Sequence, residues 1–415
     1  MIKTMTIEEA VHFLERQKNG VDVIKRMLER LDLEIDPSKV ILVAGTNGKG
    51  TTCAALQTLL LEAGKSVGFN TSPHFVKINE RIKFNGQDVS DEDFCEALQK
   101  VREKIQDFNP TYFEYLTLMS AYCFFKMKKT DYAIFEVGLG GTYDASNAIP
   151  HNISVIARLG MDHEAILGNS IIEIARNKFG IISDGGKVFH ASFDDKEVAE
   201  LARKTAKERD AEIIESRSFD LDVNTTGKYP VFEIKLPWGN FPMKMQGRRA
   251  AQNIALAATV CDNLLGDVAP VLPAISKIEW PGRMEKVEWE NRDVFLSGDH
   301  NLQGIESLLE ILQFYRFKEL RFVVGICHDK SHFEMLRKLS NFKNSRIYLT
   351  ETPLKTLPLK GYDEVFLKRA EFSSSDPIET LNAAVLDSNE NDLIVVTGSL
   401  YLVGAIKCAL AAKSA

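Results

Sequence analysis

The chain has 415 residues, of which 45% are apolar and 26% charged, and its formal net charge is −7. This composition excludes wholesale disorder and fits a globular protein of about two or three domains. The acidic balance gives no indication of nucleic-acid binding, which usually needs a basic face. Residues 1–6 lack the apolar core of a signal peptide, and the six cysteines show neither Cys-x-x-Cys nor zinc-finger spacing. We therefore expect a cytoplasmic protein with reduced thiols.

The first 290 residues alternate between helical patterns and short apolar strands. Two amphipathic helices are predicted within 6–32, strands at 40–44, 66–70, 132–137 and 153–157, and helices at 50–63, 112–128, 169–180 and 249–265. A more irregular stretch, 211–245, predicts a small side sheet. Buried strands that alternate with helices indicate an α/β domain with a mostly parallel sheet and helices on both faces.

A break at Trp280-Pro281-Gly282-Arg283 and a charged stretch from Glu285 to Asn291 predict a domain boundary at about residue 290. Beyond it the alternation restarts, with predicted strands at 294–298, 321–326, 346–350 and 393–396 and helices at 302–314, 331–339, 376–387 and 400–412. We expect domains at 1–290 and 291–415, the second smaller and Rossmann-like.

The run from Leu393 to Ala412 is almost free of charge and long enough for a membrane span. Thr397-Gly398-Ser399 interrupts it with a turn signal. The interruption favours a buried strand followed by a helix, and we expect no membrane association.

The strongest single motif joins the strand at 40–44 to the next helix and reads Gly45-Thr46-Asn47-Gly48-Lys49-Gly50-Thr51. Glycines let backbone N–H groups approach an anion at a helix N-terminus, Lys49 adds a full positive charge, and Thr51 can offer its hydroxyl to Mg²⁺. The spacing departs from the Walker pattern, because only two residues separate Gly45 from Gly48 and Gly50 follows the lysine. The strand–turn–helix context favours phosphate binding over a plain glycine-rich helix cap.

This loop resembles that of the folylpolyglutamate synthase and dihydrofolate synthase family of the Mur ligase superfamily, which has the same shortened spacing. Other segments resemble family motifs in family order, and the resemblance covers nearly the whole chain. These segments are Thr71-Ser72-Pro73-His74, Asn79-Glu80-Arg81-Ile82, Thr111-Tyr112-Phe113-Glu114-Tyr115, Glu136-Val137-Gly138-Leu139-Gly140-Gly141, Asp144-Ala145-Ser146-Asn147, Asp162-His163, Pro281-Gly282-Arg283, His300-Asn301 and Thr397-Gly398-Ser399-Leu400-Tyr401.

The resemblance implies an ATP-dependent ligase that converts a pterin-linked carboxylate into an acyl phosphate and joins it to glutamate. The implied cofactors and substrates are ATP, Mg²⁺, dihydropteroate or a reduced folate, and glutamate. We expect a monomer with no nucleic-acid partner. The implied ATP-binding residues are Gly45, Thr46, Asn47, Gly48, Lys49, Gly50, Thr51, Asn253, Arg283 and Ser297.

The resemblance implies that Ser72, Glu136 and His163 hold the metal. Glu136 also fits on physical grounds, since it ends an apolar strand where ligands gather in open α/β sheets, and a metal would resolve its burial. Without the family, Ser72 is equally well a turn serine, and His163 is better explained as a helix-cap or core histidine.

The resemblance implies catalytic roles for Lys49, Lys178 and His300. Lys178 lies in a segment that resembles the one whose lysine is often carbamylated in the family, and carbamylation would turn a cation that repels Mg²⁺ into an anion. Asn177 and Phe179 replace the commoner glutamate and alanine of this segment. The alternative is a surface lysine at a helix C-terminus.

The pterin residues implied by the resemblance are Thr111, Tyr112, Phe113, Glu114, Tyr143, Asp144 and Ala145. Aromatic rings can stack on a flat pterin, and Glu114 can accept hydrogen bonds from its donors. Tyr112 and Phe113 would otherwise be a core patch at a helix start. This segment resembles the bifunctional bacterial type, which makes dihydrofolate and also extends folates.

The glutamate-binding residues implied by the resemblance are Asp299, His300, Ser399 and Tyr401. Here the chain departs from the family, because Ser297 replaces a usual aspartate and Asp299 introduces a carboxylate two positions later. Residues two apart on a strand share a face, so Asp299 is expected to restore part of the lost charge.

Two alternatives stay open. The departure at Ser297 and Asp299 would suit a superfamily amide ligase with a different acid and amine. A decayed nucleotide-binding regulatory protein is the second, although Lys49, Glu136 and Lys178 are retained. A P-loop kinase or GTPase lacks support, because the loop spacing differs and no guanine-reading motif is present.

Overall fold

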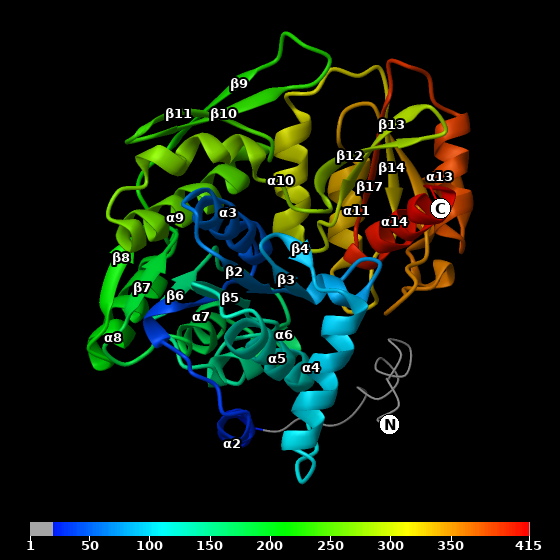
Figure 1. The fold of residues 1–415 in the computed structure, drawn as a ribbon. Coiled ribbons are helices and arrows are strands. Elements are labelled where there is room, and N and C mark those ends of the chain that lie inside the picture. The colour runs from blue at the N-terminus through cyan, green and yellow to red at the C-terminus, as the bar shows by residue number, and fades with distance from the viewer. Residues whose placement is uncertain (1–19, 415) are drawn as a thin grey trace. The chain divides into compact units, whose positions relative to one another are not determined.

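The computed structural model describes residues 20–414. The chain forms two compact units, each with its own large sheet (Figure 1). The first unit comprises the residues up to Asp220 with Lys235–Phe241 and Gln252–Ile278, and the second comprises Leu221–Ile234, Pro242–Ala251 and the chain from Glu279 onward. Of the two helices expected within 6–32, the second is α2 (Val21–Arg30), whereas the residues before 20 lie outside the described part of the chain.

An eight-stranded sheet forms the first unit, in the order β4-β3-β2-β5-β1-β6-β7-β8. Six of the strands are parallel, and β3 and β4 are antiparallel at one edge. All five residues of the central strand β1 are buried, as a continuous apolar run predicts for a strand covered on both faces. The strands are β1 (Val40–Ala44), β2 (Val67–Asn70), β3 (Ile82–Phe84), β4 (Gln87–Asp88), β5 (Tyr132–Glu136), β6 (Ile153–Ile156), β7 (Lys187–His190) and β8 (Glu212–Glu215).

Helices cover both faces of this sheet: in Figure 1, α3 lies on one side and α4, α5 and α7 lie on the other. Helix α3 packs against β1, β2, β5 and η5, so its residues are buried around most of its circumference. The helices are η1 (Pro37–Lys39), α3 (Lys49–Glu62), η2 (Ile78–Arg81), α4 (Asp91–Lys104), α5 (Tyr112–Tyr122), the π-helical η3 (Cys123–Met127), η4 (Ala145–Ala148), α6 (Glu164–Leu167), α7 (Ile171–Phe179), α8 (Lys196–Glu208), α9 (Gly247–Leu265) and η5 (Ala269–Lys277).

The second unit contains a six-stranded sheet in the order β12-β13-β17-β14-β15-β16. Only β12 is antiparallel to its neighbour. The strands are β12 (Arg283–Trp289), β13 (Arg292–Ser297), β14 (Leu320–Val324), β15 (Ser345–Thr350), β16 (Phe372–Ser374) and β17 (Leu393–Thr397). The helices are α10 (Leu302–Leu312), α11 (His332–Ser340), η6 (Leu359–Gly361), α12 (Glu364–Arg369), α13 (Pro377–Leu386) and α14 (Leu400–Ser414). The predicted strand–turn–helix at 393–412 is confirmed by β17 and α14.

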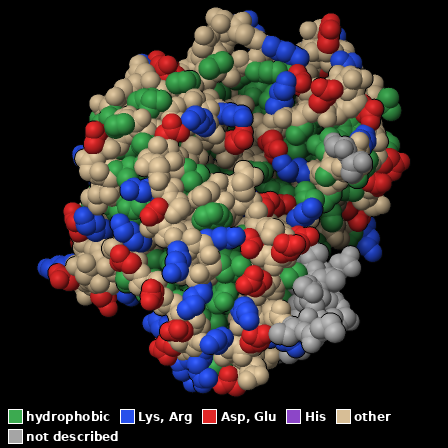
Figure 2. Space-filling view, viewed as in Figure 1, with side chains coloured by type: hydrophobic (Ala, Val, Ile, Leu, Met, Phe, Trp, Pro, Cys, Tyr) green, Lys and Arg blue, Asp and Glu red, His purple; other side chains and the backbone are tan. Residues whose placement is uncertain are grey.

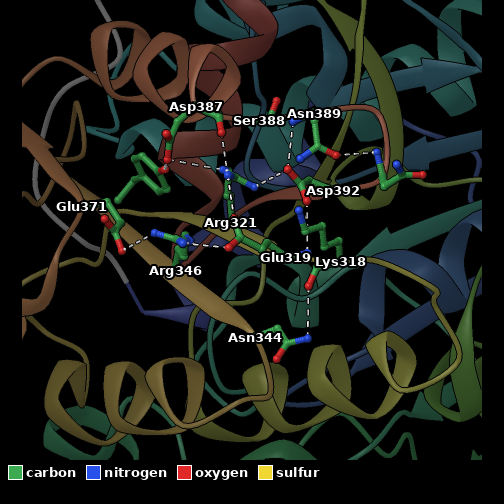
Figure 3. A network of polar contacts seen from close by, with 12 residues as sticks. Lys318, Glu319, Arg321, Asn344, Arg346, Glu371, Asp387, Ser388, Asn389 and Asp392 are labelled. Atoms are coloured by element: carbon green, nitrogen blue, oxygen red, sulfur yellow. Dashed lines mark hydrogen bonds and ion pairs between the residues drawn. The ribbon is translucent and has the colours of Figure 1, made fainter.

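A buried arginine ties the strand starts of this second sheet to the loop before β17 (Figure 3). Arg321, at the start of β14, is 3% exposed and lies 2.7 Å from Asp392 and 2.8 Å from Glu319. Its NH2 group also donates to the Asp387 carbonyl at 2.6 Å. Glu319 accepts in turn from Arg346 on β15 at 2.7 Å. Arg321 and Asp392 are buried together, so each compensates the charge of the other. The network lies at the strand starts, opposite the carboxyl ends at which open α/β sheets bind ligands.

Two predicted boundaries differ from the structure. The units divide at Ile278 and not at residue 290, because β12 pairs with β13 from Arg283↔Ser297 to Trp289↔Arg292. The charged stretch is one face of an antiparallel edge strand, with Lys286 exposed and Trp289 buried. The side sheet predicted at 211–245 is narrower: it contains β9 (Asp220–Asn224), β10 (Val231–Leu236) and β11 (Gly239–Met243) in the order β11-β10-β9, whereas β8 joins the edge of the eight-stranded sheet.

Acidic and basic side chains are interspersed over the face shown in Figure 2. Within residues 20–414, no helix combines the length and the apolar character that a bilayer crossing requires.

Candidate active site

The predicted phosphate loop, Gly45–Thr51, connects the end of β1 to the first turn of α3. Gly48 caps the helix with φ 88°, and a Cβ atom there would lie 2.5 Å from Oδ1 of Asn253. Only glycine fits this left-handed, crowded position. The N–H groups of Thr46 and Asn47 donate to the Arg158 carbonyl at 2.9 and 3.2 Å, which fixes the loop against the segment after β6. The first turn of α3 then presents backbone N–H groups to an anion.

Two lysines from distant parts of the sequence meet at this loop. Lys49 Nζ donates to the Gly45 carbonyl at 3.1 Å, and Lys178 Nζ donates to the same oxygen at 3.0 Å. Lys178 is 4% exposed. Burial, and then the positive charge of Lys49, lower the pKa of Lys178 to about 7. A buried lysine with this pKa is partly an uncharged, nucleophilic amine near neutral pH.

Local contacts hold Lys178 in place. Its helix, α7, starts with a capping box between Ser170 and Glu173. At the other end, the N–H and the hydroxyl of Thr142 both donate to the Asn177 carbonyl at 2.9 Å. A Cβ atom on Gly141 would lie 3.0 Å from the Cα atom of Lys178. The glycine-rich turn after β5 therefore packs directly on the backbone that carries the lysine.

The structure brings Ser72 and Glu136 together at the carboxyl end of β5. Glu136 is 5% exposed, and its Oε2 atom accepts hydrogen bonds from the Ser72 N–H at 3.2 Å and from the Thr71 hydroxyl. His163 is exposed in the segment before α6, with φ 53°. The same segment is tied to the phosphate loop, because the Thr46 hydroxyl donates to the Gly160 carbonyl at 2.9 Å.

The donor set fits a magnesium ion. In the described part of the chain, no three His, Cys, Asp or Glu side chains gather into a metal cluster. Mg²⁺ usually needs only one or two carboxylates, since waters and substrate phosphates complete its shell. Glu136, buried beside the hydroxyl-bearing Ser72 and near a phosphate loop, supplies an environment of this kind.

The predicted pterin segment lies at the start of α5. Thr111 and Glu114 form a capping box, in which Glu114 Oε2 accepts from the Thr111 N–H at 2.8 Å. The Phe113 ring covers Gly138, where a Cβ atom would lie 2.5 Å from Cζ of the ring. The Tyr112 ring lies 5.2 Å from the Arg81 guanidinium, and burial raises the pKa of Tyr112.

The other predicted pterin residues lie in the turn after β5. Tyr143 is 81% exposed, whereas Asp144 and Ala145 are buried. The Asp144 carboxylate accepts from the N–H groups of Gly138 and Leu139 at 3.1 and 3.0 Å and also from Ser146. Burial raises the pKa of Asp144 despite these hydrogen bonds. Its observed task is therefore to shape the turn that follows Glu136, and its contact with a pterin stays a prediction.

In the second unit, the chain after β13 carries the residues that depart from the family pattern. The Ser297 hydroxyl donates to Asp299 Oδ2 at 2.6 Å, although β13 ends at Ser297. The Asp299 carbonyl accepts from the Gly398 N–H at 3.0 Å, which joins this loop to the end of β17. Burial raises the pKa of Asp299, while Arg283, Ser297 and Arg249 oppose that rise. Asp299 thus lies beside Ser297 and in the field of two arginines.

The remaining residues predicted for the glutamate end lie on neighbouring loops of the same unit. His300 Nδ1 lies 2.9 Å from the Gly298 carbonyl, to which it can only donate. The Ser399 hydroxyl accepts from the Tyr401 N–H at 3.1 Å and lies 3.4 Å from the Cys327 thiol. These residues occupy the carboxyl ends of parallel strands, where open α/β sheets bind ligands.

Family models match most of the chain. The Mur ligase middle domain matches residues 43–261, and the Mur ligase glutamate ligase domain matches residues 282–400. A curated relative, the dihydrofolate synthase/folylpolyglutamate synthase of Bacillus subtilis, is 31% identical over 412 residues, which cover 94% of this chain and 94% of the relative. The chain belongs to this family.

Solved structures of the dihydrofolate synthase/folylpolyglutamate synthase family share the fold. Escherichia coli FolC in complex with DHPP and ADP is 26% identical, with a TM-score of 0.83 and coverage of 99% of both chains. A bifunctional folylpolyglutamate synthase/dihydrofolate synthase with Mn, AMPPNP and L-glutamate bound is 27% identical, with a TM-score of 0.83 and coverage of 98% of both chains. The predicted family and the predicted α/β fold class are confirmed.

Sequence reasoning assigned no role to three residues whose side chains support the site. Arg81 joins the loop of Ser72 to Tyr112, and Thr71 shares the Glu136 carboxylate with Ser72. Arg249 faces Asp299 from the start of α9. The contact of Lys178 with Gly45 spans 133 positions and has no local signal.

Proposed function

We propose that this chain is an ATP-dependent ligase that activates a pterin-linked carboxylate as an acyl phosphate and joins it to glutamate. One observation carries the proposal: two lysines, Lys49 and Lys178, converge on the Gly45 carbonyl of a glycine-rich loop at a helix N-terminus. This loop lies next to the strand whose last residue is the buried Glu136. Lys49 and the backbone N–H groups of this loop supply positive charge where a triphosphate and a carboxylate must approach each other.

The chemistry takes two steps. The carboxylate oxygen attacks the γ-phosphorus of ATP, and the bond to the bridging oxygen breaks, which gives an acyl phosphate and ADP. The glutamate amine then attacks the acyl carbon, the C–O bond to phosphate breaks, and the amine loses a proton, which gives an amide and inorganic phosphate. The phosphate loop and Lys49 bind the transferred group, and Gly48 lets the backbone approach it. Arg283 and Asn253 are proposed nucleotide contacts.

Ser72, Glu136 and His163 would hold a divalent metal. When bound, that metal neutralises phosphate charge and helps to align the γ-phosphate. The bifunctional relative solved with Mn, AMPPNP and L-glutamate bound supports the binding of a divalent ion and a nucleotide in this family.

Lys178 is the proposed site of a carbamate. Its pKa of about 7 provides an uncharged amine that can attack CO₂, forming an N–C bond and releasing a proton. The product is an anion, which removes the repulsion between Lys178 and Lys49. Carbon-13 NMR of protein in labelled bicarbonate tests this point: a carbamate carbon signal should appear in the wild type and be absent from Lys178→Met. Equal spectra would contradict the assignment.

The proposed acid substrates are dihydropteroate and reduced folates, because the segment at 111–114 resembles the bifunctional type and the 31% identical relative carries both names. Tyr112 and Phe113 are proposed to stack on the pterin, with Thr111, Glu114, Tyr143, Asp144 and Ala145 around them. Asp299, His300, Ser399 and Tyr401 are proposed for the glutamate end. A monomer in the cytoplasm is our proposal for the assembly and its location.

One specific observation favours a second candidate. Where family members usually have an aspartate, this chain has Ser297, and its carboxylate lies two positions later at Asp299, hydrogen-bonded to Ser297. A carboxylate at this shifted position would suit an amine substrate other than glutamate. ADP release measured with Mg²⁺ and dihydropteroate or tetrahydrofolate, with glutamate or another amino acid as the amine, separates the two. Activity with glutamate supports the first candidate, and activity with only another amine supports the second.

A further inference from the structure

Arg81 contacts two parts of the first unit, the loop that follows Ser72 and the start of α5. The proposed chemistry uses the first for the metal and the second for the pterin. Arg81 is the last residue of η2, directly before β3, and its backbone is fixed because its carbonyl accepts from the Thr71 N–H at 3.0 Å and from Asn70 Nδ2 at 3.2 Å. Its side chain is half-buried. Arg81 lies in a segment that resembles a family motif, but no role was predicted for it and the proposed catalytic steps do not use it.

The guanidinium of Arg81 makes one contact with each part. Its Nε–H donates to Nδ1 of His74 at 2.8 Å, and His74 lies two residues after Ser72. Its Cζ atom lies 5.2 Å from the centre of the Tyr112 ring. A planar guanidinium can stack on a ring and donate from its edge at the same time, which an ammonium group cannot do.

Both partners are held independently of Arg81. The loop after His74 is closed by Glu80, whose carboxylate accepts from the N–H groups of Phe75, Val76 and Lys77 at 2.7 to 2.8 Å. Tyr112 opens α5, whose start is fixed by the capping box of Thr111 and Glu114. The Arg81 side chain therefore joins two parts that each have local hydrogen bonds of their own.

We propose that Arg81 is a positioning residue for the acid substrate: it fixes the Tyr112 ring against the loop that carries Ser72. This inference rests on the proposed function, in which Tyr112 stacks on a pterin. Arg81 acts through Tyr112 and does not take part in phosphoryl transfer. Its loss should weaken binding of the pterin acid and leave ATP binding almost unchanged.

The test compares Michaelis constants in the ADP-release assay for the full-length wild type and its variants. Arg81→Met should raise KM for dihydropteroate about tenfold, equivalent to about 1.4 kcal/mol, and change KM for ATP by less than about twofold. Arg81→Lys keeps a cation over the ring and should raise the same constant by only about threefold. Arg30→Met is the matched control, because Arg30 also lies over a ring in this unit, 6.0 Å from Phe108, away from the predicted site residues.

A double-mutant cycle with Tyr112→Leu tests whether Arg81 affects pterin binding through Tyr112. If Arg81 acts through Tyr112, Arg81→Met should add little to KM in the Tyr112→Leu background. Additive effects, an equal rise in KM for ATP, or an equal rise in Arg30→Met would each overturn the inference alone. If Arg81→Met does not fold, Arg81→Lys provides the test. A rise in its KM for dihydropteroate without a rise in its KM for ATP supports the inference, and an equal rise in both overturns it. A wild type that releases no ADP with either dihydropteroate or tetrahydrofolate would overturn the proposed function and this inference with it.

Discussion

Replacing Lys178 with methionine should stabilise the protein while abolishing ligation. The folded-state pKa of about 7 lies below the ordinary lysine value of about 10.4, so between these values the unfolded chain binds more protons than the folded chain. Folding is therefore penalised in full below about pH 7, and the penalty vanishes as the pH rises towards about 10.4. Methionine has a similar length and no charge, which removes the penalty.

The size of this free-energy penalty follows from the difference between the folded-state and ordinary pKa values of Lys178. At 1.36 kcal/mol for each pH unit, the penalty reaches at most about 5 kcal/mol. Methionine loses the hydrogen bond to the Gly45 carbonyl, a net contribution of about 1 kcal/mol, so we expect a net stabilisation of about 2 to 4 kcal/mol at pH 7.

Urea unfolding in CO₂-free buffer at several pH values between about 7 and 10 measures this difference. The free energy of unfolding of the wild type should rise with pH relative to that of Lys178→Met, and the two should converge near pH 10. Added bicarbonate should stabilise only the wild type, because only Lys178 can form the carbamate. A difference between the two proteins that does not change with pH would refute the assignment of a low pKa to this lysine.

Three further substitutions test separate parts of the structure. Gly48→Ala forces a Cβ atom against Asn253 at a left-handed position, so it should cost about 1 to 3 kcal/mol of stability and raise KM for ATP, which urea unfolding and ADP-release kinetics will show. Asp299→Ala should raise KM for the amine substrate, while an unchanged value would show that this carboxylate does not replace the aspartate lost at Ser297. Arg321→Met leaves the buried carboxylate of Asp392 without its cation and should lower the free energy of unfolding by about 3 to 5 kcal/mol; a loss below about 1 kcal/mol would contradict the buried Arg321–Asp392 pair in Figure 3.

Much of the fold follows from local patterns in the sequence. Continuous apolar runs such as Val40–Ala44 have one stable place, the middle of a parallel sheet, and β1 is found there. The boundary between the units could not be read in the same way. Alternation of charged and buried residues in Arg283–Trp289 indicates an edge strand as well as a linker, and only its pairing with β13 decides between them.

In the candidate site, too, local motifs could be predicted from the sequence and tertiary contacts could not. The predicted phosphate loop is a contiguous motif, and the sequence was enough to predict its strand–turn–helix geometry. Its binding of phosphate stays a prediction. The contacts of Lys178 with Gly45 and of Arg81 with Tyr112 arise from tertiary packing, and no spacing rule predicts them. The hydrogen bonds from the Gly138 and Leu139 N–H groups to Asp144 were likewise not predicted, and the pterin contact implied for Asp144 by the family resemblance stays a prediction.

The most direct test of the central claim is ADP release by the wild-type protein with ATP, Mg²⁺ and glutamate, measured with and without a pterin acid. We predict ADP release that depends on dihydropteroate or tetrahydrofolate, formation of an equal amount of the glutamate amide, and loss of both in Lys49→Ala. ADP release that does not depend on either pterin acid, or its complete absence, would contradict the account.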